Sequence, residues 1–302
     1  MSTLDFEGRV ALVTGAGRGL GRAHAKLLAS RGAAVVVADL GVGLGGDGDS
    51  EGPAEEVVQE IVAAGGEAIA ATESVAESEG GEALVAKALA TYGRLDIVIN
   101  NAGILRDKSF GKLSDDDVDA VLAVHLKGAF NVTRPAWRQM RERGYGRILN
   151  TASSSGVLGN FGQANYGAAK MGLVGLTRVL AIEGFRYGIR VNALAPMART
   201  RMTENLLGEL VEALDPELVA PVAAWLVHED CEATGEIYTA AAGRVARFFV
   251  GMTRGYYDPE LTIESVRDNF ETAREVGDFL EPSGAEGEIA YLSELLAEKA
   301  PG

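Results

Sequence analysis

The sequence predicts an α/β protein with a doubly wound parallel sheet, on three observations. Short apolar runs rich in β-branched residues alternate with helical patterns over the first 240 residues. The runs are continuously apolar, which is typical of strands covered by helices on both faces. The chain has 302 residues, 47% of them hydrophobic, and is long enough to bury one large core. We therefore expect one domain over residues 1–258 and an extension over 259–302.

Five strands are expected, at 9–14, 33–39, 95–100, 146–152 and 189–195. After the first strand, apolar residues recur at i, i+3, i+7 and i+8 from Leu20, which indicates a helix. Longer helices are expected over about 114–142 and 163–187. Residues 41–53 carry six glycines between 41 and 52, and this composition indicates a surface loop.

The last part of the chain has a different composition. Residues 259–302 include 11 acidic and 3 basic residues, a net charge of −8 against −15 for the whole chain. Apolar residues still recur there at helical spacing, in the stripes Ile263, Val266, Phe270 and Ile289, Leu292, Leu296. We expect two amphipathic helices docked on an apolar surface of this chain or of a second copy. A solvated acidic tail is the alternative.

Charge and residue counts exclude several classes of protein. A net charge of −15 repels nucleic acid and anionic membrane surfaces, and no apolar run reaches the ~18 residues of a membrane span. The single cysteine, Cys231, excludes an intrachain disulfide. His24, His125 and His228 lack the spacing of zinc ligands, so we expect no metal site. The start of the chain is not a signal peptide, and we expect a cytoplasmic location.

The first strand leads directly into TGAGRGLG (14–21) and then into the first helix. A glycine-rich turn that opens a helix allows a phosphate to approach the backbone at the positive end of that helix. The sequence therefore predicts a Rossmann-type nucleotide site. Its candidate cofactor-binding residues in this turn are Gly15, Arg18, Gly19, Leu20 and Gly21.

The second strand ends in Asp39, about 20 residues after the glycine-rich turn. A carboxylate there can accept hydrogen bonds from an adenosine ribose, and it repels the 2′-phosphate of NADP. Arg18 argues the other way, because its guanidinium could pair with that phosphate. No basic residue directly follows Asp39. We therefore expect this carboxylate to determine the choice between NAD and NADP, and the cofactor to be NAD.

The sharpest chemical signal is the pair Tyr166 and Lys170. Residues i and i+4 share one helix face, so the Lys170 ammonium can lie beside the Tyr166 phenol. A free tyrosine has a pKa near 10, and a nearby cation or a positive nicotinamide ring favours the phenolate. Ser153 stands at the end of a predicted strand, where open α/β sheets place their ligands. These three residues are candidate catalytic residues.

Together these motifs resemble those of the short-chain dehydrogenase/reductase family, over about residues 6–240. The matching pieces are the TGxxxGxG turn, NNAG at 100–103, Ser153, and Tyr166 with Lys170. The resemblance implies that Tyr166 is the general acid/base and that Ser153 orients the substrate oxygen. It also implies that Lys170 binds the nicotinamide ribose and lowers the pKa of Tyr166. Tyr166 and Lys170 would thus contact the cofactor, and the other contacts implied are Ser74, Val75, Asn101, Ala102, Gly103, Pro196 and Thr200.

The sequence departs from the family pattern at three positions. His125 replaces the usual catalytic Asn, whose backbone carbonyl holds a water of the proton relay. The carbonyl of His125 could keep that role, and a packed core histidine is the alternative. Met197 follows Pro196 where the family has glycine, and Ser74 stands where the family often has Asp against adenine.

Four segments look more specifically like the (3R)-3-hydroxyacyl-CoA dehydrogenase part of type 2 peroxisomal multifunctional enzymes. They are GNFGQANY (159–166), NNAGILRDKSF (100–110), VHLKGAF (124–130) and APMARTRMTE (195–204). This likeness implies NAD-dependent oxidation of a 3-hydroxyacyl-CoA or another apolar secondary alcohol to the ketone. Leu158, Phe161 and Met197 are candidate wall residues for an acyl chain or a sterol, and ordinary loop packing is their alternative.

Two other activities stay open within the class, hydroxysteroid dehydrogenase and 3-oxoacyl-carrier-protein reductase. A non-catalytic nucleotide-binding sensor is the alternative from a different class. The helices over 114–142 and 163–187 hold more apolar positions than one sheet face can cover. We therefore expect a homo-oligomer, a dimer or a tetramer.

Overall fold

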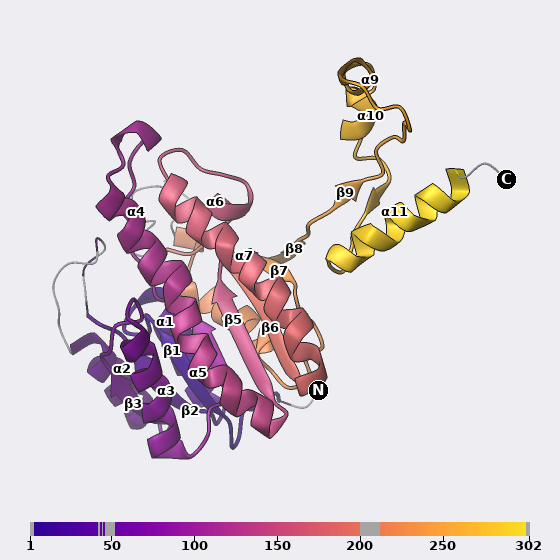
Figure 1. Cartoon of the computed structure of the whole chain (residues 1–302). Helices are drawn as coiled ribbons and strands as arrows, with labels where there is room; N and C mark the ends of the chain where they lie inside the picture. Colours follow the sequence, from indigo (N-terminus) through magenta and orange to yellow (C-terminus); the bar gives the residue numbers. More distant parts are fainter. Residues whose placement is uncertain (1–2, 42, 44, 46–51, 200–211, 300–302) are drawn as a thin grey trace. The chain divides into compact units, whose positions relative to one another are not determined.

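The computed structural model describes residues 3–41, 43, 45, 52–199 and 212–299. Its centre is an eight-stranded sheet in the order β3-β2-β1-β4-β5-β6-β7-β8, drawn in Figure 1. The strands are β1 (Val10–Thr14), β2 (Ala34–Ala38), β3 (Glu67–Ala71), β4 (Ile97–Asn100), β5 (Gly146–Thr151), β6 (Ile189–Pro196), β7 (Ile237–Ala241) and β8 (Arg244–Phe248). From β3 to β7 every neighbouring pair is parallel. The predicted doubly wound sheet is therefore confirmed.

Helices cover both faces of this sheet and form a separate apolar core on each. The first core is built under α1 (Gly19–Ser30), α2 (Gly52–Ala63) and α8 (Ala220–Leu226). The second core is built under α3 (Ser78–Tyr92), α5 (Gly128–Arg143) and α7 (Ala164–Gly184). Because both faces are buried, the strands between them are mostly apolar, as the sequence indicates. β5 and β6 also bury the polar side chains of Arg147, Asn150 and Asn192.

The sequence missed three strands of this sheet and simplified two helices. β3, with the sequence EAIAA, has only one β-branched residue, and β7 and β8 are short strands that end the sheet. The helix expected over 114–142 is α4 (Asp115–Leu122), a π-helical turn (Ala123–Lys127) and α5 in succession. The helix expected over 163–187 is α7 with a short 3₁₀ turn at Phe185–Tyr187. α2 begins at Gly52, inside the segment expected to be a loop.

Contacts divide the chain into two units, Met1–Arg247 and Phe248–Gly302. The second unit has a two-stranded antiparallel sheet of β9 (Met252–Thr253) and β10 (Phe279–Leu280). Its helices are α9 (Ile263–Asp268), α10 (Phe270–Arg274) and α11 (Ala285–Lys299). The first predicted stripe thus spans two short helices, since α9 stops before Asn269, and the second stripe lies on α11. None of the described residues of this unit is buried.

None of the described helices is both long enough and apolar enough to cross a bilayer.

Candidate active site

The glycine-rich turn between β1 and α1 is shaped by close backbone packing. Gly15 and Gly19 have φ of 64° and 51°, a region that favours glycine. A Cβ at Gly21 would lie 2.1 Å from the carbonyl oxygen of Gly15, and a Cβ at Gly17 would lie 2.9 Å from Cγ of Asp39. The open backbone in front of the twelve-residue helix α1 suits the phosphates of a dinucleotide.

Asp39 lies directly beside this turn, as the sequence predicts. Its Oδ2 accepts a hydrogen bond from the Gly17 N–H (2.8 Å), and its Oδ1 accepts one from the Gly41 N–H (2.8 Å). Both oxygens are therefore fixed, and Asp39 lines the same cavity as Arg18 and Leu20. An acid held in this place can accept hydrogen bonds from a ribose and repels a phosphate.

Asn101 fastens the end of β4 to the glycine-rich turn. Its Nδ2 donates to the carbonyl oxygens of Thr14 (2.9 Å) and Gly15 (3.1 Å), and its N–H donates to Oγ1 of Thr14 (3.0 Å). The neighbouring Asn100 donates from Nδ2 to Oδ1 of Asn150 on β5 (2.9 Å). The NNAG segment thus ties three adjacent strand ends together at the edge where the nucleotide site lies.

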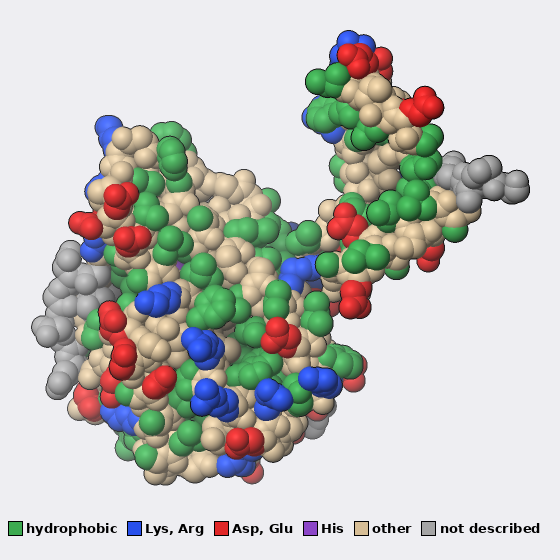
Figure 2. All heavy atoms as spheres, in the orientation of Figure 1, with side chains coloured by type: hydrophobic (Ala, Val, Ile, Leu, Met, Phe, Trp, Pro, Cys, Tyr) green, Lys and Arg blue, Asp and Glu red, His purple; other side chains and the backbone are tan. Residues whose placement is uncertain are grey.

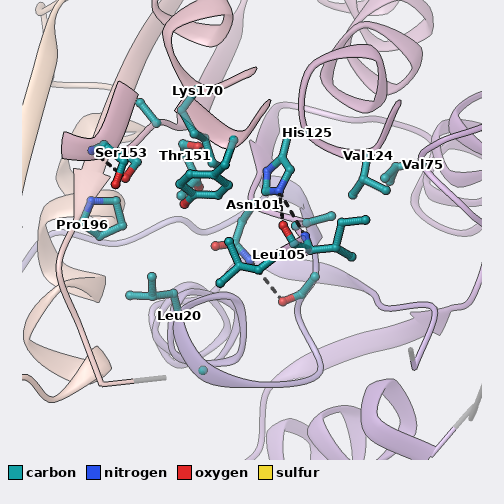
Figure 3. A pocket seen from close by; sticks show the side chains of 18 of the residues that line it. Leu20, Val75, Asn101, Leu105, Val124, His125, Thr151, Ser153, Lys170 and Pro196 are labelled. Carbon is teal, nitrogen blue, oxygen red and sulfur yellow. Dashed lines mark hydrogen bonds between the residues drawn. The ribbon is translucent and has the colours of Figure 1, made fainter. Parts of the chain in front are cut away.

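Ser153, Tyr166 and Lys170 meet in one cavity of about 800 Å³. Ser153 follows β5, while the other two residues lie one turn apart on α7. The hydroxyl groups of Tyr166 and Ser153 are hydrogen-bonded. Figure 3 shows Ser153 and Pro196 on one side of this cavity and His125 on the other.

Lys170 lies near the Tyr166 ring, as the helix spacing suggests, and its ammonium is held by the backbone of β5. Its Nζ donates to the carbonyl oxygen of Thr151 (2.5 Å) and lies 5.5 Å from the centroid of the Tyr166 ring. The side chain is almost fully enclosed, and burial lowers the pKa of Lys170 to about 7. The Thr151 carbonyl is a functional group that the sequence reasoning missed, since any residue type supplies it.

The surroundings of Tyr166 act on its pKa in opposite directions. Burial raises the pKa of this phenol, the hydrogen bond with Ser153 lowers it, and the charge of Asp107 raises it. The lowering of this pKa by Lys170, which the sequence predicts, stays a prediction.

His125 lies in the π-helical turn that joins α4 to α5. Its Nε2 is 2.8 Å from the carbonyl oxygen of Ile104 and 3.1 Å from the Ile104 N–H. Its ring meets the ring of Tyr166 edge to face, with centroids 5.1 Å apart. Burial, together with the charge of Lys170, lowers the pKa of His125 to about 3, so the imidazole is neutral. The imidazole itself packs against Tyr166, a contact that the sequence did not foresee.

The remaining predicted contacts fall into two groups. Ser74, Val75, Ala102, Gly103, Pro196, Leu158 and Met197 line the cavity. Phe161 is not among the lining residues and is 90% exposed. Thr200 lies outside the described residues.

The cavity thus combines a fixed glycine-rich turn, an acid beside it and a Ser–Tyr–Lys group on one sheet edge. Residues 9–209 match the family model of the short chain dehydrogenases. The chain belongs to the short-chain dehydrogenase/reductase family, a family of oxidoreductases.

Among curated proteins, the chain is 49% identical to peroxisomal multifunctional enzyme type 2 of Mus musculus. That match covers 98% of this chain and 40% of the mouse protein, so the chain spans less than half of this relative. Hydroxyacyl-CoA dehydrogenase ChsB1 of Mycobacterium tuberculosis is 36% identical, over 89% of this chain and 90% of that protein. Among solved structures, full-length peroxisomal multifunctional enzyme type 2 of Drosophila melanogaster superposes with a TM-score of 0.82. It is 39% identical, and the match covers 98% of this chain and 50% of that one.

Proposed function

We propose that this protein oxidises the secondary alcohol of a 3-hydroxyacyl-CoA to the ketone, with NAD as the cofactor. The observation that carries the proposal is the meeting of Ser153, Tyr166 and Lys170 in the cavity that Asp39 also lines. The relatives named above include a hydroxyacyl-CoA dehydrogenase of nearly the same length, and this favours a CoA thioester over a sterol.

In this mechanism the chain positions the alcohol and accepts its proton. Ser153 holds the substrate oxygen, and Oη of Tyr166 takes the hydroxyl proton as the carbinol C–H bond breaks. Bound NAD supplies the acceptor for the hydride. General-base assistance of this kind contributes about 10² to 10⁴ in rate. Lys170, with a pKa of about 7, can hold or release a proton at physiological pH while Thr151 keeps its Nζ in place.

The cavity also has walls that suit an acyl chain. Leu158 and Met197 line it, and both side chains are exposed to any bound molecule. Burial of apolar surface stabilises a bound chain by about 25 cal/mol for each Å². We propose these two residues, rather than Phe161, as the wall of the acyl site.

The test is absorbance at 340 nm with NAD and NADP in parallel, over 3-hydroxyacyl-CoA thioesters, hydroxysteroids and simple secondary alcohols. Tyr166→Phe is expected to lower turnover by at least about 10² and to leave NAD affinity within a few-fold, because only the proton-accepting hydroxyl is lost. Tyr187→Phe, which removes a hydroxyl bonded to Arg141 outside the cavity, is the matched control. More than a tenth of the activity in Tyr166→Phe would contradict the role of this residue. Oxidation of a sterol alone would contradict the substrate class.

We also propose that the protein is a homo-oligomer, which joins through α5 and α7. Figure 2 shows hydrophobic side chains over these helices. The exposed apolar residues of α5 and α7 include Phe130, Met171, Val179 and Ile182. Light scattering that reports a monomer at micromolar concentration would contradict this. The cytoplasmic location stays a prediction, because the multifunctional relatives named above are called peroxisomal.

A further inference from the structure

Arg106 lies on the loop that follows β4 and lines the cavity described above. Its carbonyl oxygen accepts a hydrogen bond from Nδ2 of Asn165 (3.2 Å), the residue before Tyr166 on α7. Its Nε donates to the carbonyl oxygen of Gly45 (3.1 Å). The backbone of Arg106 is thus tied to the catalytic helix, and its guanidinium extends toward the segment that follows Asp39.

Neighbouring charges are already paired within the protein. Asp107 accepts a hydrogen bond from Nε2 of Gln163 (2.6 Å), and Lys108 forms an ion pair with Asp117 (2.5 Å). Lys170, the other cation near the reacting group, donates to a backbone carbonyl. Both terminal nitrogens of Arg106, in contrast, have no hydrogen-bond partner in the described part of the chain.

An unpaired guanidinium at a cavity selects for an anion, and its planar donors fit a phosphate in bidentate geometry. The net charge of −15 and the carboxylates of Asp39 and Glu73, which line the same cavity, repel an anion. An anion therefore needs a local cation such as Arg106 in order to bind there. The terminal nitrogens of Arg106, unpaired among the described residues, therefore mark a place where a phosphoryl group can bind.

We propose that Arg106 binds a phosphoryl group of a coenzyme A thioester at the mouth of the cavity. The proposal deepens the proposed function and rests on its substrate class. A bound dinucleotide has its own phosphate site at the glycine-rich turn and the start of α1. Arg106 is outside that turn and is held by the catalytic helix, so we assign its phosphate to the substrate.

The experiment compares thioesters with and without phosphate. Calorimetry measures Kd for coenzyme A and, separately, for NAD. Steady-state assays measure kcat/KM for a 3-hydroxyacyl-CoA and for the pantetheine thioester of the same acid, which has no phosphate. The variants are Arg106→Gln and Arg106→Lys. Lys112→Gln is the matched control, because it removes an exposed cation six residues further along the chain, outside the cavity.

We expect Arg106→Gln to weaken coenzyme A binding about tenfold or more, as for the loss of a hydrogen bond to a charged group. The preference for the CoA thioester over the pantetheine thioester falls by the same factor. Arg106→Lys keeps the charge and recovers part of the loss, and Lys112→Gln changes neither quantity.

Three results would overturn the inference. The thioester preference and coenzyme A binding could both be unchanged in Arg106→Gln. The two thioesters could lose kcat/KM equally, which would show that Arg106 only shapes the loop. Arg106→Gln could weaken the binding of NAD but not of coenzyme A, which would show that Arg106 binds a phosphate of the cofactor. If coenzyme A binds through Arg106 but no thioester is oxidised, the inference stands and the proposed function fails.

Discussion

Replacement of Asp39 by alanine separates its two roles in the nucleotide site. The carboxylate accepts hydrogen bonds from the N–H groups of Gly17 and Gly41, both at 2.8 Å. It also faces the place where the sequence pattern predicts an adenosine ribose. The substitution is therefore expected to loosen the turn, weaken NAD binding and improve NADP binding.

The two effects have different sizes. A hydrogen bond to a charged group contributes about 1.5–3 kcal/mol. After a discount for partial exposure, loss of both lowers the free energy of unfolding by about 2 kcal/mol, or Tm by roughly 4–8 °C. Two unit charges in contact at about 4 Å repel by about 4 kcal/mol in a dielectric of about 20. If half of this is screened by solvent, the NAD/NADP preference changes by about 30-fold.

The assay is titration calorimetry of NAD and NADP on the same preparation, because the ratio of the two Kd values cancels any general loss of stability. Asp39→Asn removes the charge but keeps one oxygen, so it is expected to change the ratio with a smaller loss of Tm. Asp258→Ala, which removes a carboxylate that accepts from the Glu260 N–H in the second unit, is the control. A wild type that already prefers NADP would mean that Arg18 decides the cofactor. An unchanged ratio in Asp39→Ala would refute the role of the acid.

Three further predictions concern Lys170, the buried histidines and residues 259–302. Lys170→Ala is expected to weaken NAD binding and to slow turnover, measured by calorimetry and by absorbance at 340 nm; an effect on neither would remove it from the site. Burial lowers the pKa of His125 to about 3 and of His24 to about 4. The unfolded chain binds more protons below about pH 6.5, so the free energy of unfolding falls as pH drops from 6.5 toward 4. The fall is about 2 kcal/mol per histidine at pH 5. Urea unfolding at pH 7 and pH 5 should show His125→Asn losing one of these contributions while it keeps its turnover. If turnover is lost without any loss of Tm, the imidazole itself takes part in the proton relay. Deletion of residues 259–302 is expected to leave NAD binding intact and to lower Tm or alter substrate preference; no change in either would make this segment a solvated appendage.

Strands rich in β-branched residues were predictable, because burial on both faces leaves a continuous apolar run. The run VALVT became β1 and IVIN became β4. β3 was not predictable in this way, since alanine suits a helix as well as a strand. Its place was decided by pairing with β2, from Ala34↔Glu67 to Ala38↔Ala71.

The positions of the candidate site residues were predictable where residue type and spacing determine them. Tyr166 and Lys170 had to share a helix face, and Asp39 had to follow a strand. The hydrogen bond from Lys170 to Thr151 was not readable, because its acceptor is a backbone carbonyl brought near by the packing of β5 against α7. The exposure of Phe161 to solvent was also not predictable, because loop residues have no periodicity that distinguishes buried from exposed positions.

The second unit, Phe248–Gly302, affects where a protease cleaves the chain and how the chain unfolds on heating. Fixing the backbone of each residue costs about 1–2 kcal/mol in entropy, and among the described residues of this unit no buried side chain offsets that cost. Its internal contacts include the β9–β10 pair, the Arg254–Asp278 ion pair and the stacked rings of Phe249 and Phe279, with centroids 5.0 Å apart. A protease added at low dose should therefore cut this segment long before it cuts the sheet. Calorimetric scans of the whole chain should depart from a single two-state transition, and the nicked protein should still retain a dinucleotide.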